Sequence, residues 1–276
     1  MKFCDLHTHS VYSDGTWTPV QLIEEAEKLG LSSIALTDHN TVAGLPDFLK
    51  AAEGKNVEAV PGIEFSTDYG DKDVHILGLF IRPEHYAPIT ECLEEVQMRK
   101  DESNRALAEA LTRAGYPVDY DQMKSKVPGG QLNRAHFAAE LVRMGVAEDR
   151  KDAFSRLLKP ECGYYQPPKR MTSFEAMDFI KSMGAVAVWA HPYLTLNREE
   201  VPVFLEEAVK HGLDAMETIY VTYDQETIQL AQETAARFGL KESGGSDFHG
   251  ENKPGICLGW GKGDLQVPAD LLEALK

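Results

Sequence analysis

Residues 33–53, SIALTDHNTVAGLPDFLKAAE, contain the pattern on which the fold prediction rests. The apolar run 33–37 is typical of a buried β-strand, and segment 42–53 has the apolar spacing of an amphipathic helix. A strand followed by a helix is half of a βαβ unit, in which successive strands lie parallel. The stretch therefore predicts an α/β fold built on a parallel sheet.

The same alternation continues toward both ends of the chain. Further strands are predicted at 2–7, 57–63, 74–81, 185–190 and 214–217 and near Leu240, and further helices at 19–29, 172–183, 201–210 and 225–238. The helix at 19–29 has a clear start, because Thr18 can cap it and Pro19 suits its first position. Its apolar residues also keep helical spacing.

Between residues 85 and 169 the β-rich runs disappear and helical periodicity replaces them, including segments 135–144 and 153–158. We therefore expect residues 1–84 and 170–276 to form one discontinuous, barrel-like domain. Residues 85–169 are expected to form a helical insertion beside or over the functional site.

The chain is acidic. Its 276 residues include 28 Lys and Arg against 44 Asp and Glu, which gives a formal net charge of −16. Such a surface repels long polyanions, so we expect no duplex DNA partner. A small phosphorylated metabolite or a short oligonucleotide stays possible, because a metal cluster can reverse the field locally.

The four cysteines form no C-x-x-C pair, which argues against a zinc ribbon or a dithiol redox site. The N-terminal segment has no apolar region like that of a signal peptide, and no run of eighteen apolar residues occurs. These features predict a soluble cytoplasmic protein without a membrane partner, and they leave the oligomeric state open.

Potential metal ligands recur at or near the predicted strand ends. They are His7, His9, His39, Glu64, His75, His191, Asp247 and His249. His7 and His9 stand two apart in an extended segment, so their side chains leave the same face. Each residue alone has an ordinary explanation, such as a core histidine or a solvated strand end. Their joint occurrence indicates a metal site, because parallel α/β folds gather strand ends on one face.

The ligand types are imidazole and carboxylate without thiolate, which suits Zn²⁺, Mn²⁺ or Fe²⁺ and separates these ions poorly. A set of this size exceeds the four positions that one zinc ion offers, so at least two ions are expected. Paired ions about 3.5 to 4 Å apart are the usual device for displacement at phosphorus.

Six motifs resemble, in the same order, those of the PHP superfamily, named for polymerase and histidinol phosphatase. They are His7-Thr8-His9, Ser13-Asp14-Gly15, Thr37-Asp38-His39-Asn40, Gly62-Ile63-Glu64, Ala190-His191-Pro192 and Ser246-Asp247-Phe248-His249. The similarity runs from residue 3 to about 250. It implies a distorted (β/α)₇ TIM-like barrel with a trinuclear metal site on its C-terminal face.

The resemblance also implies which residues hold each ion. The three sets are His7, His9, Glu64 and Asp247; Asp14, His39 and His249; and His75 and His191 together with Glu64. Asp14 departs from the family pattern, in which other members carry histidine, so the second ion is the least defined. Asp5 and Asp38 precede ligands closely, and we expect at least one of them to support the ligands from behind; salt bridges or solvation are the alternatives.

Within the superfamily, the chain most resembles the branch that removes phosphate from nucleoside 3′,5′-bisphosphates and trims short oligonucleotides from the 5′ end. That branch carries a helical insertion with a motif like residues 133–137, NRAHF. Arg134 and His136 fall where a helix should start, which suits anion binding, although a solvated helix start would look the same. Lys169 and Arg170 are weaker candidates for substrate binding.

The implied reaction is hydrolysis of a phosphomonoester by a hydroxide that bridges two ions. His191, His249 and Arg134 are the predicted catalytic residues, with Arg134 orienting the substrate. Histidinol phosphate phosphatase and a metal-dependent amidohydrolase are the alternatives. A non-catalytic module with a decayed site is disfavoured, because every ligand position is filled. The chain's length and acidity also argue against a piece of a replicative polymerase.

Overall fold

The computed structural model describes residues 2–126 and 132–276. The chain divides into two compact units, one formed by Met1–Glu91 with Met171–Lys276 and the other by Cys92–Arg170. No helix in these described residues is both long enough and apolar enough to cross a membrane.

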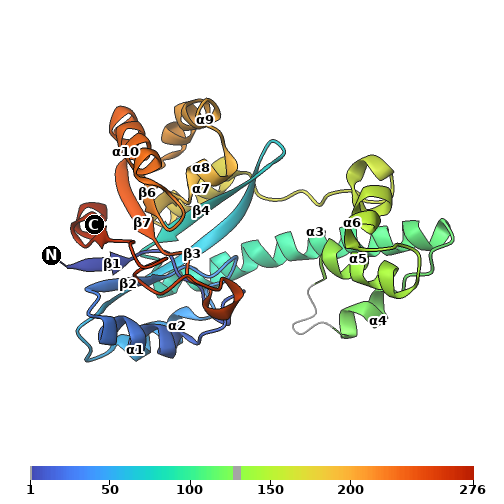
Figure 1. Cartoon of the computed structure of the whole chain (residues 1–276), viewed down its shortest axis with the longest axis horizontal. Coiled ribbons are helices and arrows are strands. Elements are labelled where there is room, and N and C mark those ends of the chain that lie inside the picture. The colour runs from blue at the N-terminus through green and yellow to red at the C-terminus, as the bar shows by residue number, and fades with distance from the viewer. Residues whose placement is uncertain (1, 127–131) are drawn as a thin grey trace. The chain divides into compact units, whose positions relative to one another are not determined.

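The first unit is a mixed α/β barrel built on one eight-stranded sheet in the order β7-β6-β5-β4-β3-β2-β1-β8 (Figure 1). The strands are β1 Phe3–Asp5, β2 Ser33–Leu36, β3 Glu58–Tyr69, β4 Lys72–Leu79, β5 Val186–Trp189, β6 Ala215–Tyr220, β7 Lys241–Gly245 and β8 Val267–Pro268. The amide of Leu6 donates to the carbonyl of Gly244 at 3.1 Å, which brings the chain after β1 against β7 and nearly closes the ring. The predicted TIM-like barrel is confirmed.

One part of the sheet differs from the predicted βαβ alternation. β3 does not end near residue 63 but continues to Tyr69, and β4 returns beside it as the second strand of a hairpin. β4 is therefore antiparallel to both β3 and β5, whereas β1–β2–β3 and β5–β6–β7 are parallel. The turn contains Gly70 at φ 62°, a conformation that glycine adopts without strain. This hairpin is the distortion of the barrel.

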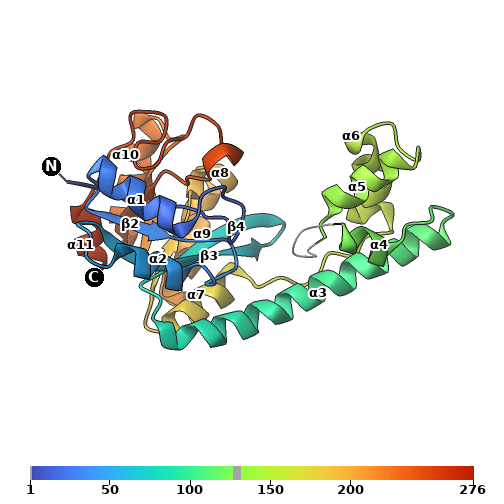
Figure 2. The same cartoon turned by 90° about the horizontal axis from the view of Figure 1, so that it is seen from below.

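The longer helices of the first unit follow the predicted segments closely. They are α1 Pro19–Leu29, α2 Leu45–Ala52, α7 Ser173–Ser182, α9 Glu200–Ala208 and α10 Gln225–Phe238, with shorter α8 Pro192–Thr195 and α11 Asp270–Leu275. Thr18 caps α1 as predicted and shares a capping box with Gln21. α1 and α2 lie together on the outer side of the sheet near β2 and β3 (Figure 2).

The interior of the barrel is filled with apolar side chains. Buried members of this core include Cys4, Leu6, Ala35, Val60, Leu77, Val188, Ala215 and Val267. Because these side chains fill the space between the strands, the barrel interior is a packed core and not a pore. Polar side chains that follow the parallel strands therefore gather above this core, at the carboxyl ends of those strands.

The second unit is helical and has its own apolar core. Helix α3, Tyr86–Arg113, begins in the first unit and continues into the second, which also contains α4 Tyr120–Ser125, α5 Arg134–Arg143 and α6 Arg150–Ala153. The predicted helix at 153–158 is instead a short π-helical turn, Phe154–Leu158, which follows α6 directly. The core of the second unit includes Leu107, Leu111, Phe137, Leu141 and Leu157.

Candidate metal centre

The first unit brings all nine predicted ligands into one cluster. His7 and His9 follow β1, His39 follows β2, His191 follows β5, and Asp247 and His249 follow β7. These positions lie where parallel strands end, as the sequence predicts. Glu64 and His75 differ, because both lie inside strands rather than at their ends.

The hairpin explains how Glu64 and His75 reach the cluster. Glu64 lies just past the segment of β3 that pairs with β2, and its backbone forms an isolated parallel β-bridge with that of His39. β4 runs in the opposite direction, so its beginning lies at the face where the parallel strands end. His75, the fourth residue of β4, therefore arrives at the same face from the other direction.

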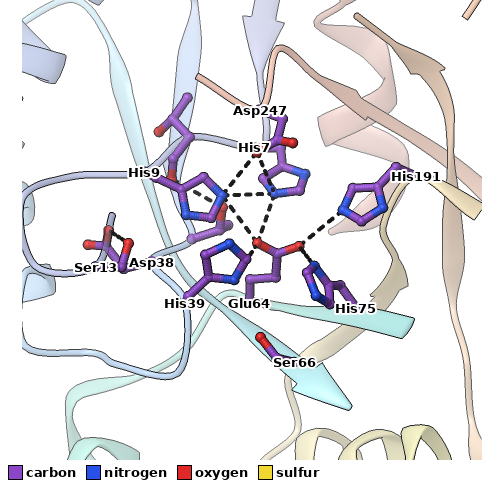
Figure 3. Close-up of polar contacts among 12 residues, drawn as sticks. His7, His9, Ser13, Asp38, His39, Glu64, Ser66, His75, His191 and Asp247 are labelled. Atoms are coloured by element: carbon purple, nitrogen blue, oxygen red, sulfur yellow. Dashed lines mark hydrogen bonds and ion pairs between the residues drawn. The ribbon is translucent and has the colours of Figure 1, made fainter. Parts of the chain in front are cut away.

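The carboxylate of Glu64 is the centre of the cluster (Figure 3). Its Oε2 lies 3.2 Å from His7 Nε2, 3.2 Å from His9 Nε2 and 3.0 Å from His39 Nδ1, and its Oε1 lies 2.8 Å from His75 Nδ1 and 3.3 Å from His191 Nε2. One fully buried acid thus faces five imidazoles, which is a position from which a carboxylate can bridge two cations.

Asp247 and Asp14 complete the cluster on the side of His9. Asp247 Oδ1 lies 3.2 Å from His9 Nε2 and 3.3 Å from His249 Nδ1. Asp14 Oδ1 lies 3.1 Å from His249 Nε2, and its Oδ2 lies 3.9 Å from His39 Nε2. Asp14 is the more exposed of the two, with 56% of its side chain accessible.

The cluster contains four overlapping groups whose potential ligand atoms lie within 4.8 Å of one another. The groups are His9, Asp14, His39 and His249; His7, His191 and Asp247; His7, His9 and Glu64; and His39, Glu64 and His75. The group around Asp14 contains the predicted second set together with His9. His75 and His191 fall into different groups, although both face the same oxygen of Glu64.

The arrangement fits divalent cations better than it fits a hydrogen-bonded core. Within the described residues, His9 Nδ1, His39 Nδ1, His191 Nδ1 and Glu64 Oε2 are buried without a hydrogen bond. The Nε2 atoms of His7 and His9 face each other at 3.1 Å. Buried polar atoms normally have partners, and converging imidazole nitrogens and carboxylate oxygens are the donors that Zn²⁺, Mn²⁺ and Fe²⁺ accept.

The protonation states show how strongly these charges interact. Burial opposes a charge on His7, but Glu64, Glu217 and Asp247 outweigh it and raise the pKa of His7 well above its usual value. Burial likewise opposes a charge on His75, yet Glu64 and Asp73 raise the pKa of His75 to about 10. The acids that would face cations therefore favour the protonated forms of His7 and His75.

Two other members of the cluster titrate in the opposite direction. Burial lowers the pKa of His39 to about 4, so this imidazole is neutral and available as a ligand near pH 7. Burial works against ionisation of Asp14, but the hydrogen bond with His249 and the neighbouring imidazoles lower the pKa of Asp14 to about 2.

Glu217 is a functional candidate that the sequence reasoning missed. It is fully buried in β6, its Oε1 lies 2.9 Å from His7 Nδ1, and its Oε2 accepts from the backbone amide of His191 at 2.6 Å. A carboxylate behind a ligating histidine fixes the ring and its tautomer. A glutamate among the apolar residues of AMETIY was the available signal, since a buried charge needs a partner.

The sequence predicts that at least one of Asp5 and Asp38 supports the ligands from behind, but within the described residues their hydrogen bonds go to serines and backbone amides, mainly of the segments that carry the ligands, and not to ligand side chains. Asp5 accepts from the amide and the hydroxyl of Ser246 at 2.9 and 2.5 Å. Asp38 accepts from the amide and the hydroxyl of Ser10 at 2.7 and 2.6 Å. Each acid thus ties its own strand end to the neighbouring ligand segment.

Close packing and an unusual backbone also hold the cluster together. His191 and Asp247 have φ values of 33° and 51°, in the left-handed region that residues other than glycine rarely adopt. Gly245 allows β7 to approach β1, because a Cβ at this position would lie 2.5 Å from the Cβ of His7. Such strain is stored at functional sites when surrounding contacts fix the conformation.

The four predicted substrate-binding residues all lie in the second unit. Arg134 begins α5 as predicted, and its guanidinium lies 4.6 Å from the ring centre of Tyr165. His136 forms a capping box with Asn133, so its Nδ1 already accepts a hydrogen bond from the backbone. Lys169 is exposed and Arg170 is half-buried. Their role in substrate binding stays a prediction.

Comparison with known proteins gives matches along the whole chain. Residues 5–156 match the PHP domain family. A 5′-3′ exoribonuclease of Salmonella typhimurium is 34% identical over 92% of this chain and 87% of its own length. A 3′,5′-nucleoside bisphosphate phosphatase of Chromobacterium violaceum is 30% identical over 94% of this chain and 91% of its own length.

A solved structure shares the architecture. It is that of a candidate metal-dependent phosphoesterase from Bifidobacterium adolescentis, with a TM-score of 0.72 and 30% sequence identity. The match covers 99% of this chain and 95% of the other, so it includes the barrel and the helical insertion alike.

Proposed function

The chain belongs to the PHP domain family and is a metal-dependent phosphoesterase, and from that premise we propose that it removes phosphate from a nucleoside 3′,5′-bisphosphate or a short 5′-phosphorylated oligonucleotide. The observation that carries this proposal is the cluster of nine imidazoles and carboxylates around Glu64. The two full-length relatives support the substrate class, since their names specify a bisphosphate phosphatase and an exoribonuclease.

The ligand cluster would hold two or three ions, for which Mn²⁺, Zn²⁺ and Fe²⁺ are the candidates. When bound, such ions activate water as a nucleophile and neutralise the charge of phosphoryl oxygens. Glu64, facing two sets of imidazoles, is the residue that would bridge the ions. Because the substrate is an anion and the chain carries a net charge of −16, these ions are also needed to make the site attractive to it.

The residues of the chain position the substrate and its protons. The departing alcohol needs a proton, which His191 rather than His249 would supply from Nδ1, because His191 Nε2 is the ring nitrogen that faces Glu64 and the cluster. His191 Nδ1 has no hydrogen-bond partner within the described residues, whereas His249 uses Nδ1 for the carbonyl of Asp247 and Nε2 for Asp14. Arg134 in the helical insertion, residues 85–169, would orient the substrate through its phosphate oxygens.

A phosphate-release screen with each of the three ions tests the proposal. The substrates are a nucleoside 3′,5′-bisphosphate, a short 5′-phosphorylated oligonucleotide, a cyclic nucleotide and histidinol phosphate. We expect turnover of the first two and its loss in Glu64→Gln. The matched control is Glu58→Gln, which alters an exposed residue of the same strand. Preference for histidinol phosphate, or inertness toward all four substrates, would contradict the proposed substrate class.

A further inference from the structure

A lysine that no motif identifies reaches the edge of the metal cluster. Lys253 lies in the segment after His249, and its Nζ is 2.5 Å from Asp247 Oδ2. The Lys253 side chain is 36% exposed, whereas that of Asp247 is 6% exposed. Lys253 thus presents a positive charge that solvent, and therefore a dissolved substrate, can reach from outside the cluster.

Lys253 does not occupy the face of Asp247 that meets the imidazoles. Oδ1 of Asp247 is the oxygen directed toward His7 and His9, at 3.6 and 3.2 Å. Oδ2 instead accepts from the hydroxyl of Tyr220 at 2.7 Å and from Lys253. A carboxylate oxygen has two lone pairs, so these two donors satisfy Oδ2 and leave Oδ1 for a cation. The lysine and an ion can therefore coexist on Asp247.

The backbone around Lys253 is fixed by the loop that carries Asp14. The amide of Glu251 donates to Thr16 Oγ1 at 3.0 Å, and the side-chain amide of Asn252 donates to the carbonyl of Asp14 at 2.7 Å. Gly250 permits this close approach, because a Cβ there would lie 2.1 Å from Thr16 Oγ1. The ammonium group is consequently held in place before any substrate arrives, which reduces the entropy lost on binding.

We propose that Lys253 binds a non-bridging oxygen of the phosphoryl group that is transferred, and that Asp247 positions it there. An ammonium group has three donors; Asp247 takes one, and the contacts of the described residues leave two for a ligand on this partly exposed side chain. Charge-assisted hydrogen bonds to phosphate are short and strong, and they gain further where solvent is partly excluded. The inference rests on the proposed phosphoesterase activity but not on the identity of the alcohol that leaves.

If Lys253 binds the phosphoryl group, removing it should weaken the reaction of every phosphomonoester to the same extent, whatever alcohol the ester contains. Lys253→Met should lower kcat/KM by about 10- to 100-fold, the usual range for one hydrogen bond to a charged group. The loss should be the same for p-nitrophenyl phosphate and for the nucleoside bisphosphate. Calorimetry on the metal-loaded protein should show inorganic phosphate binding weakened by a similar factor. Lys253→Arg should restore most of the binding, because it returns the charge.

The control variant is Lys262→Met, an exposed lysine of the same C-terminal region, which should behave as wild type. Metal content is measured on every variant. Unchanged phosphate affinity in metal-loaded Lys253→Met would overturn the proposal, and so would a loss confined to the bisphosphate. If the wild type binds phosphate and hydrolyses p-nitrophenyl phosphate but not the bisphosphate, the proposed substrate fails while the role of Lys253 is still decided by the phosphate measurement.

Discussion

Replacing Glu217 by glutamine tests whether the cluster depends on the acid behind its histidines. Glu217 accepts two hydrogen bonds, one from His7 Nδ1 and one from the amide of His191. While the His7 Nδ1 proton points at Glu217, Nε2 faces the cluster, 3.2 Å from Glu64, and is the nitrogen that a cation would bind once its proton is displaced. Glutamine keeps the shape of the side chain but offers only one acceptor oxygen.

Both orientations of the new amide are unfavourable. If its oxygen accepts from His191, its NH₂ group faces His7 Nδ1 and favours the tautomer with the proton on Nε2, which cannot ligate a cation. If the amide turns around, the buried amide of His191 loses its acceptor, which costs about 1 to 3 kcal/mol. We expect a 10- to 100-fold loss of metal affinity or activity, the usual effect of removing such a carboxylate, which equals about 1.4 to 2.7 kcal/mol.

The assay is metal retention during dialysis against graded chelator, followed by phosphate release with metal in excess. Circular dichroism checks that the variant is folded. Glu233→Gln, an exposed position on α10, is the matched control and should retain metal like the wild type. Metal affinity of Glu217→Gln within twofold of the wild-type value would refute the tautomer argument.

Three further outcomes follow from the same geometry. Gly245→Ala should destabilise the protein by about 1 to 3 kcal/mol in a denaturant titration, because its Cβ meets His7 at 2.5 Å; unaltered stability would show that β7 can move away. Because the pKa of His75 is about 10, metal binding near neutral pH should release a proton, and the apparent metal affinity should rise as the pH increases from about 6.5 toward 10. The same proton stabilises the metal-free protein; this contribution to the free energy of unfolding is fully present below about pH 6.5 and is lost as the pH rises through about 10. Calorimetry in buffers of different ionisation enthalpy detects this release, and equal heats in all buffers would exclude it. Arg134→Gln should raise KM for the bisphosphate about tenfold with metal content unchanged, and an unaltered KM would remove Arg134 from substrate binding.

The parallel parts of the barrel and the ligands after their strands could be predicted from sequence. The apolar run 33–37 and the polar residues Asp38 and His39 that follow it are adjacent in the chain, so both the strand and its end can be recognised from the local sequence. Parallel strands direct their carboxyl ends to one face, so residues predicted one strand at a time lie together in the structure, while their role as ligands stays a prediction. Helix α10 was predicted at its observed limits for the same reason, since its spacing and its capping residues are both local.

The hairpin and the contacts behind the ligands depended on tertiary information. The sequence of residues 57–69 is compatible with a strand that stops near residue 63 or one that continues to residue 69, and the pairing with β4 fixes the longer strand. Glu217 lies 210 residues from His7 in sequence, and Lys253 approaches Asp247 through a turn without a recognisable motif. No local period encodes these pairs: Glu217 and His7 meet because separate strands end at one face, and Lys253 reaches Asp247 across the irregular segment that follows β7.

Asp5 and Asp38 show how contacts of the fold itself can position a cluster of imidazoles and carboxylates. Asp5 ends β1 and Asp38 follows β2, and each accepts hydrogen bonds from the amide and the hydroxyl of a serine on a neighbouring segment. These bonds involve no ligand side chain, so they form on folding whether or not cations are present. They fix the segments that carry His9 and Asp247. Burial opposes both charges, but the acids around His9 raise its pKa and the nearby imidazoles lower the pKa of Asp247, so protonated histidine balances acid within the cluster. Contacts of the fold therefore bring the candidate ligands together, and a cation that binds there would displace protons from a site whose backbone is already in place.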